Sequence, residues 1–487
     1  MNLFMKELDS FLFSYLGGTL MGTTQQMARF ITEANYTDIP EPAIYAAKLC
    51  ILDSIACAIY GTTRPLGKII TELVDEMGGT PQSRVLGTSI KTNAANAALA
   101  NGTLGHSEDF DDMGSGGHQA VVLMPVALAL AEELGLNGKD VLTSYLVGFD
   151  IFANVALNMG PDHYAKGWHS TSSVGTLGST AVAAKALGLD EMQTRMAIGL
   201  GATQASGLRG NFGTMTKPFH PGRASQSGII AAKMAGKGYE SNPNIMEDRF
   251  GYAACMGEEM VQLGNMTRHL GYPWAIMGTG KEVANGIDIK IWPCCGGTHG
   301  SNTAIIQLLN EYSFKYEDVE SVDIVTTDNP SCMAPNLRWP KSGLQGKFST
   351  WYTVASLIVD NGRLDLQSFT DDSANRPELQ SMLEKVNITQ EVTIAERPNR
   401  TIGGESWWDV TVTLKNGSLI NTRVPGHGDT YGPYTNIQVI DKFQALAGAV
   451  ISPTQVDTLL NLVMDLENQT NVNHIMDAAT LALTIKT

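Results

Sequence analysis

Apolar positions recur at helical spacing through most of the first half of the chain. Residues 41–60 show the pattern clearly, with Ile44, Ile51 and Ile55 on one face between a proline and a glycine. Further helices are predicted at residues 93–104, 120–134, 140–159, 174–187, 191–206 and 223–236. Many of these segments are rich in Gly, Ala and Ser, which let helix axes approach closely. The pattern therefore predicts a compact multihelical domain.

The pattern changes after about residue 286. Alternation of apolar and polar positions predicts strands at residues 321–327, 408–414 and 418–424. The dipeptide of Asn416 and Gly417 predicts a hairpin between the last two, with positive φ at both residues. Helical periodicity marks residues 300–312 and 351–360 in this part, and later residues 436–446, 454–466 and 473–484.

These patterns predict a mainly α protein with an inserted second domain. A large multihelical domain is expected to combine residues 1–286 with residues 426–487. A smaller α+β lid domain is expected at residues 287–425, because strands and helices are mixed there.

Composition narrows the classes of function. Apolar residues make up 43% of the 487 residues and charged residues 17%, which suits a sizeable core rather than a disordered chain. The net charge of −16 argues against nucleic acid and anionic membranes as partners. The longest apolar run, residues 120–131, is shorter than the roughly 20 residues that span a bilayer. The six cysteines form no secreted disulfide framework, and the N-terminus lacks a basic signal region, so we expect a cytoplasmic protein.

The first candidate cluster runs from His106 to His118 and includes three aspartates, Asp109, Asp111 and Asp112, with a glycine-rich turn. It directly precedes a predicted helix, and the helix dipole keeps a histidine there neutral and able to act as a base. One alternative is a solvated acidic loop with a capping histidine. Another is a metal held by the aspartates, although their spacing is not that of an EF-hand.

Three further clusters place histidines beside cations. His169 stands in a Gly/Ser-rich segment, and Lys217, His220 and Arg223 lie within seven residues just before a predicted helix. Cations and free backbone N–H groups at a helix start form a cradle for anions, and the alternative is an exposed basic turn.

The fourth cluster contains Lys290, Cys294, Cys295 and His299. Lys290 is predicted to bind an anion, whereas the cysteines are first of all a structural pair. A nucleophilic thiol and half of a zinc site are the alternatives, and the second half of such a site is not apparent. No cofactor-binding motif is visible elsewhere. Histidine and aspartate for proton transfer, with lysine and arginine for carboxylates, suit proton abstraction next to a carboxylate.

Six segments along the chain resemble the MmgE/PrpD family, and together they extend over nearly all of it. They are LCILDSIACAIYG, HSEDFDD with His118 downstream, GWHSTSSVGTLGS, MTKPFHPGRA, KIWPCCGGTHG and GKFSTWYTVASLIVDNG. The resemblance implies a helical domain built from both chain ends, an inserted α+β lid and a site between them. It also implies a homodimer that requires no metal or other cofactor.

Carried over residue by residue, the resemblance implies that His118, His169 and Asp109 are catalytic. It implies that Lys217 and Lys290 hold substrate carboxylates, with Arg223 and His220 as further substrate-binding candidates. The expected function is that of a cofactor-independent lyase. It would dehydrate a methylcitrate- or citrate-like acid or decarboxylate a cis-aconitate-like acid. An epimerase of a dicarboxylate such as iminodisuccinate and an inactive carboxylate-binding protein are the alternatives. Met113 and Gln119 depart from the family pattern where substrate shape would be recognised.

Overall fold

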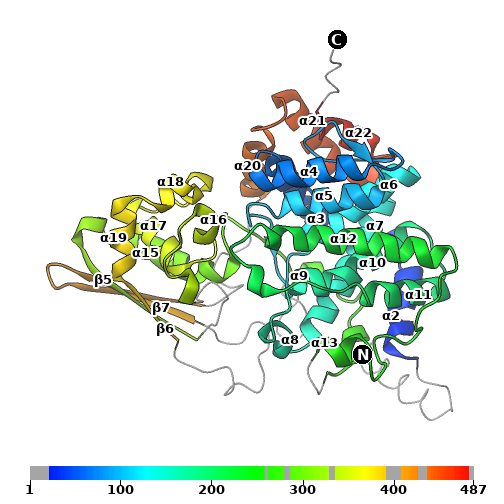
Figure 1. Cartoon of the computed structure of the whole chain (residues 1–487), viewed down its shortest axis with the longest axis horizontal. Helices are drawn as coiled ribbons and strands as arrows, with labels where there is room; N and C mark the ends of the chain where they lie inside the picture. The colour runs from blue at the N-terminus through cyan, green and yellow to red at the C-terminus, as the bar shows by residue number, and fades with distance from the viewer. Residues whose placement is uncertain are drawn as a thin grey trace.

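The protein folds as two packed regions that lie side by side (Figure 1). The computed structural model describes residues 21–257, 261–278, 286–327, 335–390, 407–425 and 436–481. One hydrophobic core joins residues 27–276 with residues 443–479, and we call this part the helical region. A second core, within residues 294–424, belongs to the α+β region. Helices dominate the described chain, so the predicted mainly α class is confirmed.

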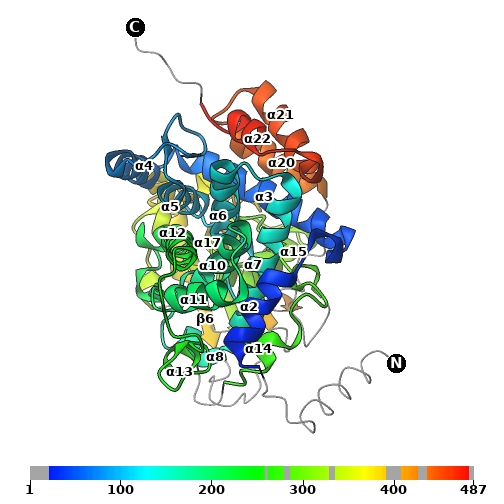
Figure 2. The ribbon, with the colours of Figure 1, turned by 90° about the vertical axis from the view of Figure 1, so that its right-hand side faces the viewer.

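The helical region is an assembly of helices from both ends of the described chain. Its longer N-terminal helices are α2 Thr23–Glu33, α3 Glu41–Gly61, α4 Pro65–Met77, α5 Ala94–Gly105, α6 Ala120–Leu134, α7 Gly138–Asn158, α10 Gly175–Ala186, α11 Glu191–Ala202 and α12 Thr216–Gly236. Its short elements are β1 Ser83–Arg84, β2 Lys91–Thr92, β3 Asp112–Met113, α8 Pro161–Ala165, α9 Ser170–Ser173, α13 Tyr252–Met256 and α14 Asn265–Arg268. The C-terminal helices are α20 Asn436–Ala447, α21 Pro453–Met464 and α22 Asn473–Ala478. Both α20 and α21 pack on α3, so the C-terminal helices complete the hydrophobic core of the N-terminal helices (Figure 2).

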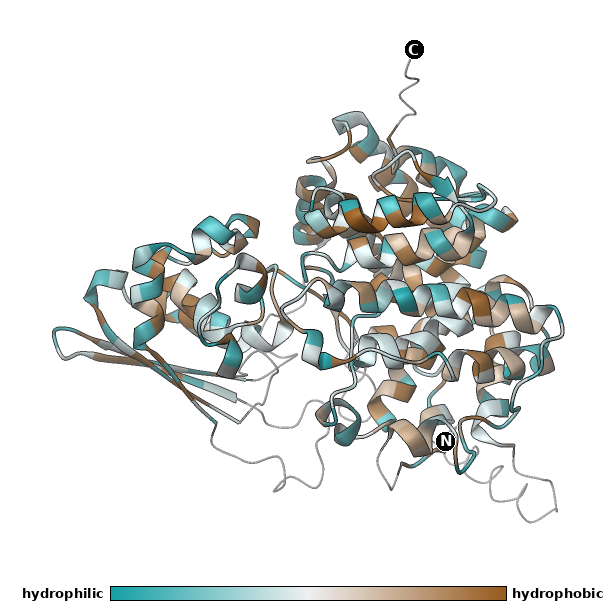
Figure 3. Ribbon diagram, viewed as in Figure 1, coloured by the Kyte–Doolittle hydropathy of each residue, from teal (hydrophilic) through white to brown (hydrophobic). Residues whose placement is uncertain are grey.

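Small residues bring the central helices into close contact. A Cβ atom at Gly222 of α12 would collide with the carbonyl oxygen of Leu99 in α5. One at Gly228 would collide with Ser179 of α10. Figure 3 shows the centre of this region largely in pale colours, because Gly, Ser and Thr have intermediate hydropathy. Close backbone packing, rather than bulky side chains, therefore holds α12 between α5 and α10.

The α+β region is a four-stranded sheet with helices on one face (Figure 1). The strands are β5 Val319–Thr326, β6 Val386–Gln390, β7 Trp407–Leu414 and β8 Leu419–Pro425, in the order β6-β5-β7-β8. Only the β5–β6 pair is parallel. The helices are α15 His299–Glu311, α16 Gly343–Gly346, α17 Thr350–Val359, α18 Asp371–Ala374 and α19 Pro377–Lys385. Buried aromatic side chains, Trp408 and Tyr352 among them, fill this core.

Two local predictions are wrong in instructive ways. Helix α12 begins at Thr216 rather than at residue 223, so Lys217 and His220 lie inside its first turns and not before them. Pro218 is tolerated there because the first N–H groups of a helix have no intrahelical partner, whereas Pro221 lies inside the helix. At the hairpin, only Gly417 has positive φ, 85°. Its N–H donates to the carbonyl of Leu414, which makes a three-residue loop with a glycine bulge rather than the two-residue turn.

Two helices, α3 and α7, are long and apolar enough to cross a membrane by length and composition alone. The sequence analysis considered only uninterrupted apolar runs and did not identify them. In the structure, 78% and 83% of their most apolar stretches are buried inside the helical region. Their apolar character is therefore explained by their position at the centre of the core.

Candidate active site

The centre of the site is Asp109, in the turn that follows α5. It has a positive φ of 51°, an uncommon conformation for a residue other than glycine. Its Oδ1 accepts hydrogen bonds from Lys217 Nζ at 2.6 Å and from Lys290 Nζ at 2.8 Å. All three side chains are buried. Burial alone would raise the pKa of Asp109, but the two ammonium groups outweigh it and hold that pKa well below its usual value.

Asp111 joins two histidines. Its Oδ1 lies 2.8 Å from His106 Nδ1, and its Oδ2 lies 3.0 Å from His118 Nδ1. The opposite ring nitrogens face Asp109, with His106 Nε2 at 3.9 Å and His118 Nε2 at 4.0 Å from Asp109 Oδ1. Burial lowers the pKa of both histidines, to about 3 for His106, so both are neutral near pH 7. The sequence analysis attributed the neutrality of His118 to a helix dipole; burial and the nearby lysines also account for it.

Asp112 has a structural task in the same loop. Its carboxylate oxygens accept the backbone N–H groups of Gln119 at 2.8 Å and Ala120 at 3.1 Å, which caps the start of α6. Burial and the adjacent charge of Asp111 raise the pKa of Asp112 to about 8. This side chain therefore fixes the loop and carries little charge at neutral pH.

His169 closes the other side of the site from the N-cap of α9. Its Nδ1 lies 2.9 Å from His220 Nδ1, and its ring centre lies 6.2 Å from that of His106. Burial, followed by the nearby Lys217 charge, lowers the pKa of His169. The ring of Phe212 meets His169 edge-on at 4.9 Å and lies 5.3 Å below Lys217 Nζ. The Phe212 ring thus packs against both His169 and Lys217.

Tertiary contacts bring the distant lysines to this loop. The short strand β3 pairs with β4, Asp288–Ile289, and the N–H of Lys290 donates to the carbonyl of Asp111 at 3.3 Å. Helix α12 brings in Lys217 from more than a hundred residues away in sequence. Lys442 of α20 donates to the backbone carbonyls of Phe110 and Lys290 and pairs with Asp53 of α3 at 2.7 Å.

The α+β region contributes Lys347, which reaches into the same loop. Its Nζ lies 2.9 Å from Glu108 Oε2 and donates to the carbonyls of Glu108 and Pro293 at 3.0 and 2.8 Å. Glu108 also pairs with Arg64 at 2.5 Å. This buried bridge ties the two regions together beside Asp109.

The site contains groups that could coordinate a metal. One ligand atom from each of His106, His118 and His169 can be chosen so that all three lie within 4.8 Å of one another. Asp109 and Asp111 form a second such group with the first two histidines. The ammonium groups of Lys217 and Lys290 sit on Asp109 and oppose a further cation there. The electrostatics therefore suits an anion better than a metal. The three aspartates considered from sequence do not form a common metal site, because Asp112 caps a helix.

The structure brings together six of the seven side chains singled out from sequence: Asp109, His118, His169, Lys217, Lys290 and His220. Arg223 does not join them, since it points along α12 and donates to Gln226 at 2.5 Å. The sequence analysis missed the roles of His106, Asp111 and Lys347. His106 and Asp111 stood inside a quoted motif, and their spacing gave no signal that one carboxylate joins two histidines.

Cys294 has the surroundings of a structural thiol. Cys294 is buried, its Sγ lies 3.2 Å from Thr298 Oγ1, and burial raises the pKa of its thiol to about 12. A thiol with that pKa is a poor nucleophile at neutral pH. For Cys294 this fits the structural role predicted for the pair.

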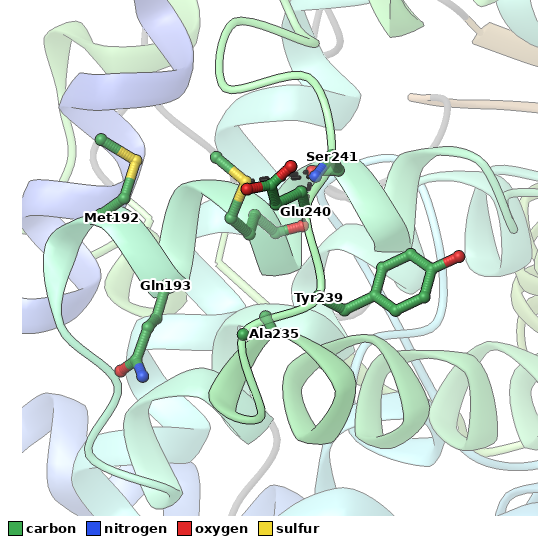
Figure 4. Close-up of a pocket in the computed structure, with 8 residues that line it drawn as sticks. Met192, Gln193, Ala235, Tyr239, Glu240 and Ser241 are labelled. Atoms are coloured by element: carbon green, nitrogen blue, oxygen red, sulfur yellow. Dashed lines mark hydrogen bonds between the residues drawn. The ribbon is translucent and has the colours of Figure 1, made fainter.

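The hollow drawn in Figure 4 lies elsewhere, between α11 and the end of α12. It has a volume of about 320 Å³ and is lined by Met192, Gln193, Met196, Ala235, Gly238, Tyr239, Glu240 and Ser241. Its lining includes an acid and no cation, so it offers no positive charge to a carboxylate.

A helical scaffold that encloses several imidazoles beside a lysine-bound carboxylate offers the groups that a proton-transfer enzyme needs. The sequence comparisons agree. The model of the MmgE/PrpD N-terminal domain matches residues 25–262, and that of the MmgE/PrpD C-terminal domain matches residues 292–468. The chain belongs to the MmgE/PrpD family, which confirms the predicted resemblance.

Several characterised relatives are similar over most of their length. The chain is 27% identical to cis-aconitate decarboxylase of Aspergillus terreus, over 94% of this chain and 95% of that one. It is 28% identical to cis-aconitate decarboxylase of Homo sapiens, over 92% of each chain. It is 24% identical to mitochondrial 2-methylcitrate dehydratase of Yarrowia lipolytica, over 78% of this chain and 74% of that one. These relatives are lyases, which supports assignment of this chain as an enzyme.

Proposed function

We propose that the protein is a cofactor-independent lyase that acts on a small di- or tricarboxylate. Decarboxylation of a cis-aconitate-like acid is the favoured reaction. The similarity to cis-aconitate decarboxylases extends over 92–94% of the chain in the two comparisons above, whereas the similarity to the dehydratase covers 78%. We also propose that it works as a homodimer in the cytoplasm; light scattering of the purified protein and cell fractionation would test these two points.

The observation that carries the proposal is the convergence of two lysines on one carboxylate oxygen. Lys217 and Lys290 both bind Asp109 Oδ1, and two histidine nitrogens lie 3.9 and 4.0 Å from that atom. A substrate carboxylate that displaces the Asp109 side chain would enter a cradle of two cations with proton carriers beside it. Charge-assisted bonds of this kind hold carboxylates strongly.

In decarboxylation, the bond between carbon and the leaving carboxylate breaks, and CO₂ departs. The electron pair stays on the substrate carbon and spreads into a carboxylate held by the lysines. A protonated imidazole of His118 or His169 then donates its proton to that carbon. In the alternative dehydration, a histidine removes a proton α to a carboxylate and another acid protonates the leaving hydroxyl; the dehydratase relative favours this second candidate.

One experiment separates the candidate reactions. The purified enzyme is incubated in D₂O with cis-aconitate, methylcitrate, citrate or iminodisuccinate, with and without a chelator, and followed by NMR. We expect loss of CO₂ from cis-aconitate. Loss of water indicates a dehydratase, bare deuterium exchange an epimerase, and no reaction with any acid an inactive binding protein. Abolition of turnover by the chelator would contradict cofactor independence.

The lysine cradle has its own test. Lys217→Met should raise KM at least about tenfold, because one charge-assisted bond to the substrate is lost. Lys233→Met is the matched control, since Lys233 lies on the same helix and pairs with Glu133 away from the site. An unchanged KM in Lys217→Met would contradict the cradle.

A further inference from the structure

His106 lies in the site but has no part in the reaction described above. Its side chain is fully buried, its Nδ1 bonds to Asp111, and its Nε2 has no hydrogen-bond partner among the described residues. His118 Nδ1 bonds to the backbone carbonyl of Asp112 at 2.6 Å and lies 3.0 Å from Asp111 Oδ2, and its Nε2 faces Asp109 at nearly the same distance as that of His106. Two imidazoles therefore lie beside the same carboxylate, Asp111, and turn their other nitrogens to the same anion position.

This arrangement has a chemical consequence. Asp111 accepts from Nδ1–H of His106 and the carbonyl of Asp112 accepts from Nδ1–H of His118, so both rings have the same tautomer and both Nε2 atoms are free of a proton. One negative charge on Asp111 stabilises one imidazolium. Two imidazolium ions would repel each other, because the centres of the rings of His106 and His118 are 4.5 Å apart. The pair is thus built to hold a single proton on either Nε2.

The surrounding charges decide when that proton is present. The groups that face the pair are Lys217 of α12, Lys290 after β4, Asp109, Asp111 and Asp112 of the same loop, and His169 at α9; Asp53 of α3 and Lys442 of α20 lie behind the loop. The two nearest lysines balance Asp109 and Asp111, and burial keeps the histidines neutral. A substrate with two or three carboxylates adds negative charge within a few ångströms of both Nε2 atoms, which favours their protonation.

We propose that His106 and His118 form one proton-carrying pair, joined by Asp111, which takes up a proton from solvent as the carboxylate substrate binds. The inference rests on the proposed function and adds His106 to the reaction. The proton leaves water or a buffer acid and forms an N–H bond at Nε2 of one ring. In decarboxylation that bond breaks as the C–H bond of the product forms, and its electron pair returns to the nitrogen.

Proton uptake can be measured directly. Binding of propane-1,2,3-tricarboxylate, a saturated acid, is followed by calorimetry at pH 7 in buffers of different ionisation enthalpy. At this pH the pKa of Asp112, about 8, leaves that carboxyl largely protonated already. We expect uptake of about one proton by the wild type, and less than about half of that by Asp111→Asn. Binding without uptake by the wild type would overturn the pair. Absence of binding would remove the proposed function and the pair together.

A second measurement separates proton transfer from packing. His106→Asn keeps an N–H group for Asp111 but lacks Nε2, so kcat should fall at least about thirtyfold with KM within about threefold of wild type. The pH profile of kcat should also lose one ionisation. His163→Asn is the matched control, because His163 is equally buried but bonds through Nδ1 to the carbonyl of Met256 and through Nε2 to Ser173. If His106→Asn does not fold by circular dichroism, His106→Gln replaces it. Wild-type kcat in a folded variant, while the wild type decarboxylates, would overturn the pair alone.

Discussion

The two regions differ in whether their charged side chains are buried or exposed. The helical region buries ionisable side chains, with Lys442 and Asp53 paired at exposures of 8% and 0% and Lys290 entirely enclosed beside it. In the α+β region, Arg423 pairs with Asp409 on the surface, at exposures of 59% and 21%, and the core is aromatic and aliphatic. Burying charge costs free energy that a structural core has no reason to incur. The difference is consistent with a candidate site whose charged groups come mainly from the helical region.

Lys347 is an instructive exception. It belongs to the α+β region, is buried, and donates hydrogen bonds to Glu108 and Pro293 beside the site. The α+β region therefore buries a charge where it meets Glu108, in the loop that carries Asp109. If buried and exposed charges differ in this way, substitutions of buried groups should have larger effects than substitutions of exposed ones.

The largest effect is expected from breaking a buried pair. Lys442→Met leaves Asp53 buried without a partner and removes donors to the carbonyls of Phe110 and Lys290, so the free energy of unfolding should fall by about 3–5 kcal/mol. Urea denaturation measures it. Adding Asp53→Leu in the same chain should restore part of the loss, since no unpaired charge remains. A fall below about 1 kcal/mol would show that this buried pair behaves like a surface pair.

The next effect concerns catalysis. His169→Asn should lower kcat at least about a hundredfold, equivalent to about 2.7 kcal/mol, because a proton-transfer group of the site is lost. Steady-state kinetics measures it, with His163→Asn as the control for a buried histidine outside the site. Near-normal turnover would remove His169 from the mechanism.

The third effect is on stability against pH. His106 has a folded-state pKa of about 3 against a usual value of 6.5, so below pH 6.5 the unfolded chain binds a proton that the folded chain does not. Its contribution is fully present above pH 6.5 and is lost as pH falls toward 3. At pH 5 the loss should amount to about 2 kcal/mol. Between pH 8 and pH 5 the wild type should lose that much more unfolding free energy than His106→Asn; equal losses would mean that His106 is charged in the folded state.

The smallest effect is expected on the surface of the α+β region. Arg423→Ala should change the free energy of unfolding by less than about 1 kcal/mol, and added salt should reduce the change further. Urea denaturation at low and high salt measures both. A loss comparable to that of Lys442→Met would remove the contrast between the two regions.

Periodicity predicted most long helices within a few residues, because an amphipathic or small-residue pattern reflects local geometry. It missed helices α2 and α4 and the start of α12, where Pro218 and Pro221 looked like helix breakers. It also missed strand β6, which has one buried position at its start and mostly half-exposed or exposed ones after it. Family motifs singled out Asp109, His118, His169, Lys217 and Lys290 as single residues. Arg223 shared a motif with Lys217, yet the turn of the helix directs it elsewhere.

The sequence by itself determined the class of fold, the family and the kinds of group available for chemistry. These follow from local patterns and from short motifs that can be recognised without knowing which residues lie next to them in space. Only the tertiary structure decided that one carboxylate of Asp109 receives two lysines and that Asp111 joins His106 to His118. Such contacts connect segments more than a hundred residues apart, or lie in a loop with left-handed residues such as Asp109 and Ser115. Their energies arise from burial and distance, which a linear pattern does not contain.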